Sequence, residues 1–249
     1  MQKTNIPTSR NVRAWLTVIL VITGVLAGCE NKQETGQTLA EPAPSPVPFP
    51  SDQSPVVQPA PTQFKLGPLF ESDIDLWEGP VPLPLELQIP ALNVTAPMLG
   101  VGLTAGNAMD SPKGSIGDPI WGSAFWYRGS GIPGEPGVAT IAGHVNDPLG
   151  RAEIFSDLED LKPGDLIIVH LKNTTMDIHF FVDQVKVYST QESSDPLVLT
   201  NIYGAGPVNG TAPQPSLDGL AHLTLITCAG YIINGEFDHH TVVFATRTD

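Results

Sequence analysis

Two side chains in this sequence, the thiol of Cys228 and the imidazole of His144, could act together as a nucleophile and a proton carrier. Cys228 follows the alternating run 223–227, which is typical of a strand, and Ala229-Gly230 predicts a turn that ends the strand at Cys228. His144 follows the apolar run 139–143, so its imidazole is expected at the end of a second strand. A thiol attacks a carbonyl only as the thiolate, which needs a base or a cation nearby. Two strand ends can meet at one rim of a barrel although 84 positions separate the two residues.

Residues 1–28 have the layout of a secretory signal peptide. Three basic residues and no acidic residue precede a short apolar run, and Leu-Ala-Gly stands directly before Cys29. This arrangement resembles the lipobox of bacterial lipoproteins, which implies lipidation of Cys29 and cleavage before it. The alternative is an uncleaved N-terminal signal anchor, for which the apolar run is short against the roughly 20 residues of a span. In both cases we expect the mature protein at the extracytoplasmic face of the cell membrane.

The cysteine count bears on the role of Cys228. The chain has 2 cysteines, and assigning Cys29 to lipid leaves Cys228 without a disulfide partner. Thiols outside the cytoplasm tend to be oxidised, so a lone thiol there is a candidate nucleophile. The alternative is inert packing, because free cysteine is among the residue types most often buried.

Residues 29–66 predict a flexible, proline-rich tether, since eight prolines between 42 and 61 exclude helix and central strand. The whole chain has a formal net charge of −14, and removing residues 1–28 takes away three positive charges and leaves −17. An acidic mature protein is a poor partner for phosphate backbones, so nucleic-acid binding is not expected.

Residues 67–249 predict one all-β domain with one or two short helices. Runs at 85–89, 96–103, 137–142, 166–171, 176–187 and 241–246 read as strands, and 172–175 reads as the turn of a hairpin. An amphipathic face over 151–161 predicts a helix, and the loop 229–240 is expected to be mobile. Many short strands at close spacing favour a closed β-barrel.

Several fragments in this order resemble the sortases, the cysteine transpeptidases of bacterial surfaces. Thr-Leu-Ile-Thr-Cys at 224–228 is similar to the cysteine motif of sortases, and Ala-Gly-His at 142–144 is similar to their histidine motif. Ile-Pro-Ala-Leu at 89–92 is similar to the start of the sortase domain. Further fragments resemble the class F branch: Ala-Met-Asp-Ser-Pro at 108–112, Gly-Glu-Pro-Gly at 134–137, and Phe155, Leu158, Leu161 and Gly164-Asp165. The resemblance as a whole spans residues 83–246.

The resemblance implies a sortase-type closed β-barrel of about eight strands, and a reaction. The Cys228 thiolate would attack a carbonyl in the C-terminal sorting signal of a secreted protein and form a thioester. An amine on the cell wall or a pilin would then take the acyl group, or water would, which gives hydrolysis. His144 would donate and accept the protons. This chemistry implies no metal and no organic cofactor.

Sortases carry an arginine about a dozen residues after the cysteine, and here that position is His240. Arg247 is expected at the far end of the last strand, about 23 Å further on. The sequence leaves three alternatives: His240 or His239 acts as the donor, Arg128 or Arg151 reaches the site from a loop, or the enzyme is impaired. The last alternative gives a second hypothesis, a catalytically weak sortase fold that binds peptides or serves in assembly.

Other candidate residues are assigned smaller roles from the sequence. Each of the remaining histidines is expected to lie outside the site. Four aromatic residues could line a substrate groove, but core packing is the preferred interpretation because aromatic side chains bury large areas. The histidines are His170, His179 and His222, and the aromatic residues are Trp121, Phe125, Trp126 and Tyr127.

Overall fold

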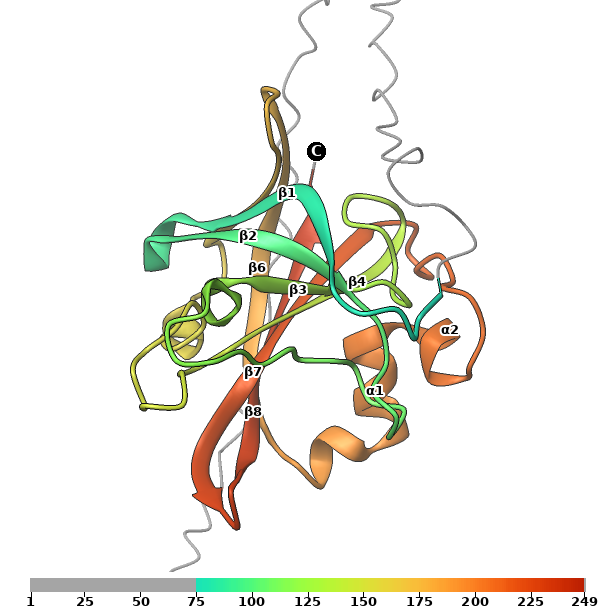
Figure 1. Cartoon of the computed structure of the whole chain (residues 1–249). Helices are drawn as coiled ribbons and strands as arrows, with labels where there is room; N and C mark the ends of the chain where they lie inside the picture. Colours follow the sequence, from blue (N-terminus) through green and yellow to red (C-terminus); the bar gives the residue numbers. More distant parts are fainter. Residues whose placement is uncertain (1–74, 249) are drawn as a thin grey trace, which may run out of the picture. The chain divides into compact units, whose positions relative to one another are not determined.

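The computed structural model describes residues 75–248, and the predicted signal peptide, Cys29 and the whole predicted tether lie outside the described residues. Eight strands form a closed barrel in the order β1-β2-β3-β4-β7-β8-β6-β5, with β5 pairing back to β1 (Figure 1). The prediction of a closed, mainly β-stranded barrel is therefore confirmed. The strands are β1 (Val81–Ile89), β2 (Val94–Val101), β3 (Ala124–Tyr127), β4 (Gly137–Gly143), β5 (Leu166–Leu171), β6 (Met176–Ser189), β7 (Ala221–Ile233) and β8 (Glu236–Arg247).

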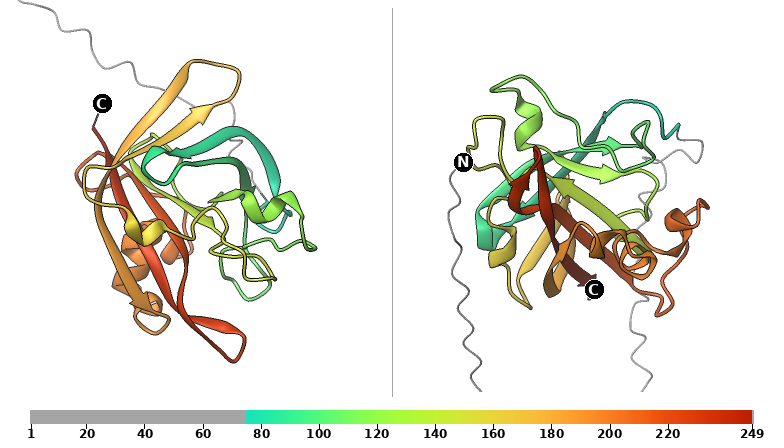
Figure 2. Two further views of the ribbon diagram at one scale, coloured as in Figure 1. Left: turned by 90° about the vertical axis from the view of Figure 1, so that its left-hand side faces the viewer. Right: turned by 90° about the horizontal axis from the view of Figure 1, so that it is seen from below.

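The helices within the described residues are short. The α-helices are α1 (Pro196–Tyr203) and α2 (Ala205–Val208), and they lie together at one side of the barrel, at the right of the right-hand view in Figure 2. The 3-10 turns are η2 (Pro90–Leu92), η3 (Pro119–Gly122), η4 (Leu158–Asp160) and η5 (Glu192–Ser194). Between residues 75 and 248 no helix has the length and apolar character needed to span a membrane.

Two strand pairs in the barrel are parallel, β2 with β3 and β4 with β7, and the other pairs are antiparallel. Alternate residues of each strand point into the barrel. On β4 and β7 the inward residues are Ala139, Ile141, Leu223 and Leu225, each at most 1% exposed. Burial of these apolar side chains fixes the register of the two strands, since a slip of one residue would turn them outward.

The outer face of the same strands is covered in part by α1. Thr140 Oγ1 donates to the carbonyl of Ile202 in α1 at 2.7 Å, and the ring of Tyr203 packs edge-on against Tyr127 at 5.8 Å. Asp195 caps the helix, because its carboxylate accepts a hydrogen bond from the Leu197 backbone N–H at 2.8 Å. The covered part of this face ends before Cys228, which is exposed.

The strand containing Cys228 does not end there, contrary to the sequence prediction. β7 runs on to Ile233 and forms a hairpin with β8 that projects from the barrel at the bottom of Figure 1. Its turn is Asn234-Gly235, with φ of 54° and 90°, the combination that favours a two-residue hairpin turn. The expected mobile loop over 229–240 is therefore wrong: it is a regular hairpin, and the Asn-Gly pair was its sequence signal.

The turn chemistry expected at Ala229-Gly230 is present, but as a β-bulge within the hairpin. The register of β7 and β8 shifts between Ala229 and Ile232, Gly230 has φ of 79°, and Asp238 accepts a hydrogen bond from the Tyr231 backbone N–H at 2.7 Å. Glycine at this position turns the strand without ending it.

The helix expected over 151–161 is also wrong. The segment contains turns and η4 only, because its backbone N–H groups bond outside it: Glu153 donates to the Val145 carbonyl and Phe155 donates to the His144 carbonyl, both at 3.1 Å. Phe155 and Leu158 are nevertheless buried, so the spacing correctly identified a buried face. The hairpin formed by β5 and β6 matches the prediction, whereas β3 and α1 were not expected.

Candidate active site

The register of β4 and β7 places His144 beside Cys228. The two strands are parallel and in register from Gly137 with Ala221 to Ala142 with Ile226. Two positions further along both chains come His144 and Cys228, and neighbouring strands lie about 4.8 Å apart. The structure thus brings together the two residues that the sequence separates by 84 positions.

A buried hydrogen bond holds the two strands together at this end. Thr227 Oγ1 donates to the carbonyl of Gly143 at 2.8 Å, and Thr227 is 5% exposed. Each partner directly precedes one of the two candidate residues. Because Thr227 points inward, the next residue, Cys228, points to the outer face, as does His144 after Gly143.

The imidazole of His144 is held by aromatic rings and a backbone carbonyl. The ring centroids of Trp121 and Phe125 lie 4.6 Å and 5.3 Å from that of His144, and the Nε2 atom lies 2.8 Å from the Pro112 carbonyl oxygen. A carbonyl only accepts, so Nε2 carries a proton in this bond and Nδ1 is the nitrogen left free to exchange one. Trp121 and Phe125 are buried, as the sequence led us to prefer, but they also position the imidazole.

Desolvation shifts the pKa values of His144 and Cys228 in the directions that favour their neutral forms over an imidazolium–thiolate ion pair. Desolvation lowers the pKa of His144 below 6.5, although the bond to Pro112 opposes this, and Lys113 lowers the same pKa while Glu153 raises it. Desolvation raises the pKa of the Cys228 thiol above its usual value, and the positive charge of Lys113 opposes that rise. The resting pair at neutral pH is therefore a thiol and a neutral imidazole.

His240 lies directly across β8 from Cys228. The two residues are partners in the β7–β8 register, and Tyr188 on β6 is the next partner beyond His240. His240 Nδ1 lies 3.1 Å from the Ser193 hydroxyl oxygen, and burial, followed by the charge of His239, lowers the pKa of His240. The position where sortases have an arginine therefore holds a mostly neutral imidazole at neutral pH.

None of the arginines within residues 75–248 takes the place of that residue. Arg247 lies at the other end of β8 and donates to the Gly134 carbonyl at 2.9 Å. Arg128 follows the far end of β3 and donates to the Glu78 carbonyl at 2.6 Å. Arg151 forms an ion pair with Asp147, with Nε 2.6 Å from the carboxylate. His239, the other suggested donor, pairs with the Asp238 carboxylate at 2.8 Å.

A pocket lies on the same face, starting one strand beyond His240. Tyr188, the partner of His240 on β6, forms one wall. Two carboxylates, Glu192 and Asp195, border the pocket, and hydrogen bonds from Ser189 lower the pKa of Glu192. The lining residues are Tyr188, Gln191, Glu192, Ser194, Asp195 and Val198.

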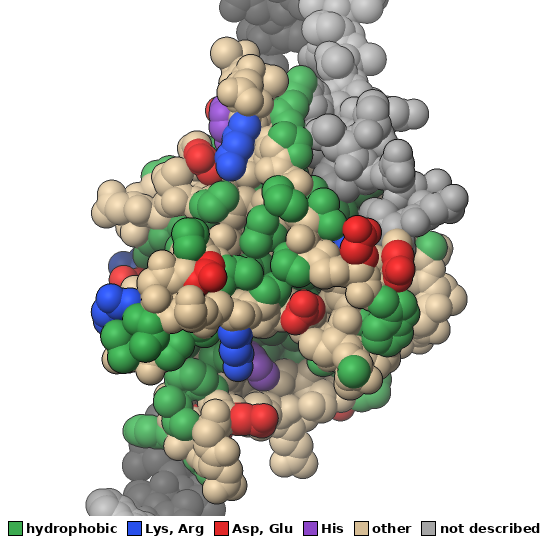
Figure 3. All heavy atoms as spheres, in the orientation of Figure 1, with side chains coloured by type: hydrophobic (Ala, Val, Ile, Leu, Met, Phe, Trp, Pro, Cys, Tyr) green, Lys and Arg blue, Asp and Glu red, His purple; other side chains and the backbone are tan. Residues whose placement is uncertain are grey.

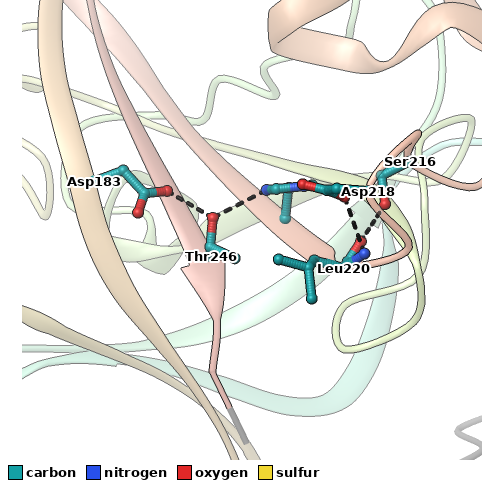
Figure 4. Close-up of polar contacts among 6 residues, drawn as sticks. Asp183, Ser216, Asp218, Leu220 and Thr246 are labelled. Carbon is teal, nitrogen blue, oxygen red and sulfur yellow. Dashed lines mark hydrogen bonds and ion pairs between the residues drawn. The ribbon is translucent and has the colours of Figure 1, made fainter.

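A second polar cluster lies at the opposite end of β7 and β8, shown in Figure 4. His222 bridges the Asp218 carboxylate at 3.0 Å and the Thr246 hydroxyl at 3.0 Å, and Thr246 donates to Asp183 at 2.6 Å. The hydroxyl proton of Thr246 faces Asp183, so His222 is not placed to remove it. His222 lies six residues before Cys228, about 20 Å along the strand, and thus outside the site.

The remaining predicted residues also lie apart from Cys228. His170 pairs with Asp177 across the β5–β6 hairpin at 2.6 Å, and Trp126 lies inside the barrel, where its indole N–H donates to the Gly131 carbonyl. No group of three or more histidine, cysteine or acidic side chains in the described part of the chain is arranged to hold a metal ion.

Sequence reasoning missed three residues around the site: Pro112, Lys113 and Ser193. Pro112 entered only as one letter of a family fragment, and nothing local indicates that its carbonyl faces His144. Ser193 lies in a short turn after β6 and reaches His240 across 47 positions. Contacts of this kind depend on how loops cross the barrel end, which has no periodic signal in sequence.

Comparison with known proteins identifies the family. The family model described as a sortase domain matches residues 87–248, and a search of curated proteins found no match. Similar solved structures include a lid mutant of sortase A from Corynebacterium diphtheriae, with 24% identity, coverage of 69% of this chain and 72% of that one, and a TM-score of 0.45. Sortase C-1 from Actinomyces oris has 22% identity, coverage of 73% of this chain and 79% of that one, and a TM-score of 0.44.

The sortase D5 transpeptidase of Clostridium perfringens has 18% identity, coverage of 66% of this chain and 78% of that one, and a TM-score of 0.43. At these identities and TM-scores, the structural likenesses carry no functional information. The family model, in contrast, covers more than half of the chain, so this protein belongs to the sortase family.

Proposed function

We propose that this sortase-family protein is a cysteine transpeptidase of the class F type, with Cys228 as nucleophile and His144 as proton carrier. The observation that carries the proposal is the parallel β4–β7 register, which sets the two residues on neighbouring strands and on one face. The exposure of Cys228 supports it as well, because a structural thiol is normally buried.

The reaction follows from these two groups. The thiol proton passes to His144 Nδ1, and the thiolate adds to a peptide carbonyl carbon, forming a C–S bond. The C–N bond breaks as the imidazolium returns its proton to the leaving amine, which leaves a thioester on Cys228. An incoming amine gives a proton to His144, attacks the thioester carbon and forms a new amide, and the thiolate leaves.

His240 is our candidate for the group that binds the carbonyl oxygen as it becomes negatively charged. The Ser193 hydroxyl donates to the Thr190 carbonyl at 3.1 Å and lies 3.1 Å from His240 Nδ1. The proposed role requires this hydroxyl to turn and donate to Nδ1 instead, which places the hydrogen of a neutral imidazole on Nε2. A neutral donor makes one hydrogen bond where a guanidinium makes two, which predicts weaker stabilisation.

The proposed setting is the extracytoplasmic face of the membrane, with Cys29 lipidated and residues 29–66 as tether, or with the N-terminal segment as signal anchor. The proposed substrates are the C-terminal sorting signal of a secreted protein and an amine on the cell wall or a pilin. With water in place of the amine, the same thioester gives hydrolysis. The signal-peptide layout and the proline-rich composition support this setting.

A thioester trap tests the proposed function. The full chain is incubated with a library of C-terminal sorting-signal peptides, and its intact mass is measured before and after hydroxylamine. We expect an acyl adduct on Cys228 that hydroxylamine removes, and no adduct on Cys228→Ala. His144→Ala should lower adduct formation by about 10²-fold or more, the range for a lost acid–base group. An equally active Cys228→Ala protein refutes the proposal.

The second candidate, a catalytically weak peptide-binding module, is favoured by one observation: a mostly neutral His240 holds the position of the usual arginine. This candidate predicts peptide binding at micromolar concentration with no turnover, and gain of turnover in His240→Arg. Turnover by the wild type at ordinary enzymatic rates, about 1 s⁻¹ or faster, excludes it.

A further inference from the structure

The residue after Pro112 lies next to the catalytic pair. The Pro112 carbonyl oxygen lies 2.8 Å from His144 Nε2, so the peptide group that joins Pro112 to Lys113 is hydrogen-bonded to the imidazole. Lys113 is exposed, and it directly follows the residue whose carbonyl lies against His144, which the β4–β7 register sets beside Cys228. On the face of the molecule drawn in Figure 3, basic and histidine side chains lie close together below the centre.

The charge of Lys113 acts on both members of the pair. It lowers the pKa of the Cys228 thiol and also lowers the pKa of His144. An ammonium attracts a thiolate and repels an imidazolium, so a single cation produces both shifts.

The other charged and titratable groups around the thiol do not supply this positive charge. His240 across β8 has a lowered pKa, and Glu153 is an anion that acts on His144. The three arginines of residues 75–248 bond to Glu78, Asp147 and Gly134, as described above. Lys113 is therefore the cation whose position fits the role.

We propose that Lys113 is the group that stabilises the thiolate of Cys228, and that it supplies from the segment before β3 the positive charge that His240 does not supply from β8. Its importance for acyl transfer rests on the proposed transpeptidase function. Its effect on the thiol does not, because the ionisation of Cys228 can be measured without any substrate.

The test is the pH profile of alkylation of Cys228 by iodoacetamide in the full chain. Cys29 is replaced by serine in every variant, so that Cys228 is the one thiol measured. In Lys113→Met we expect the thiol pKa to rise by about half a unit to one unit, as for a lost partially screened charge. The alkylation rate at pH 7 then falls about threefold to tenfold, and the rates converge at high pH, where the thiol is fully ionised.

Three controls separate charge from structure. Lys113→Arg keeps the charge and should retain the wild-type profile, whereas Lys162→Met removes an exposed lysine that does not act on either pair member and should change nothing. Addition of 1 M NaCl should reduce the difference in thiol pKa between wild type and Lys113→Met, because the Debye length falls to about 3 Å.

The proposal is overturned if Lys113→Met leaves the pH profile of alkylation unchanged. It is also overturned if Lys113→Arg lowers the alkylation rate at pH 7 as much as Lys113→Met does. The thioester trap gives a separate result. A protein without acyl-transfer activity but with the expected profiles contradicts the proposed function and leaves the role of Lys113 at the thiol supported.

Discussion

Replacing Thr227 by valine tests whether the hydrogen bond to Gly143 holds β4 and β7 together at the candidate site. Valine has nearly the same shape as threonine but cannot donate, so the buried Gly143 carbonyl loses a 2.8 Å partner. Loss of one partner of a buried hydrogen bond costs about 1–3 kcal/mol. In a domain of this size each kcal/mol lowers Tm by about 2–4 °C, so we expect Tm to fall by about 2–12 °C.

Thr140→Val is the matched control. Thr140 lies on β4, is fully buried, and donates to the Ile202 carbonyl at 2.7 Å, so the same chemical change removes a bond of the same kind. That bond attaches α1 rather than joining β4 to β7 at the site. Both variants should lose similar stability, whereas only Thr227→Val should lower the rate of acyl transfer, by about tenfold or more, since small displacements of reacting groups have large effects.

Thermal unfolding followed by near-UV circular dichroism measures the first effect, and single-turnover acylation well below Tm measures the second. Equal rates in wild type and Thr227→Val, together with the expected loss of stability, would show that the bond stabilises the barrel without positioning the thiol. An equal loss of rate in both variants would show that general loosening, and not this bond, controls the site.

Two further predictions concern the hairpin and pH. Gly230→Ala should destabilise the protein by more than Gly235→Ala. Both glycines have positive φ, but a Cβ at 230 would meet the Asp238 carboxylate, whereas a Cβ at 235 would meet nothing within 4 Å. Urea unfolding at pH 7.5 measures the difference in stability between the two variants. Equal losses would contradict this packing. Since burial lowers the pKa values of His144 and His240 below 6.5, the unfolded chain binds more protons, and stability should be fully present above pH 6.5 and fall as pH drops below it. The urea midpoint should therefore decrease from pH 8 to pH 5.5, and a double substitution of the two histidines by asparagine should flatten that decrease; an unchanged slope in the double variant would contradict the assignment.

The strands could be predicted from sequence because their burial is periodic. Leu223 and Leu225 alternate with outward residues, and that alternation is the same property that fixes the β4–β7 register. The position of His144 directly after a strand followed from where the apolar run stops, whereas the strand end predicted at Cys228 was wrong because β7 continues to Ile233. The resemblance to sortases then gave the barrel, which alternation alone indicated only as a fold class.

The segments that were wrong or missed are those whose structure depends on distant backbone partners. Residues 151–161 have helical spacing, but Phe155 donates its backbone N–H to His144 instead of to a helical carbonyl. The Pro112 contact with His144 and the Ser193 contact with His240 join loops to the barrel rim across 32 and 47 positions. Local propensity contains no information on such pairings, so the groups that surround Cys228 and His144 could be identified only from the structure.

The parallel pairing of β4 and β7 also has a consequence for biogenesis. Between the two strands the chain adds β5, β6, α1 and α2, so their pairing must wait until this whole insertion has been synthesised. Pairings of high sequence separation form late, since the entropy of closing a long loop is lost before contacts compensate it. A nascent or truncated chain consequently holds Cys228 with no imidazole beside it. The arrangement of thiol and imidazole on which the proposed acyl transfer depends therefore arises only on completion of the barrel.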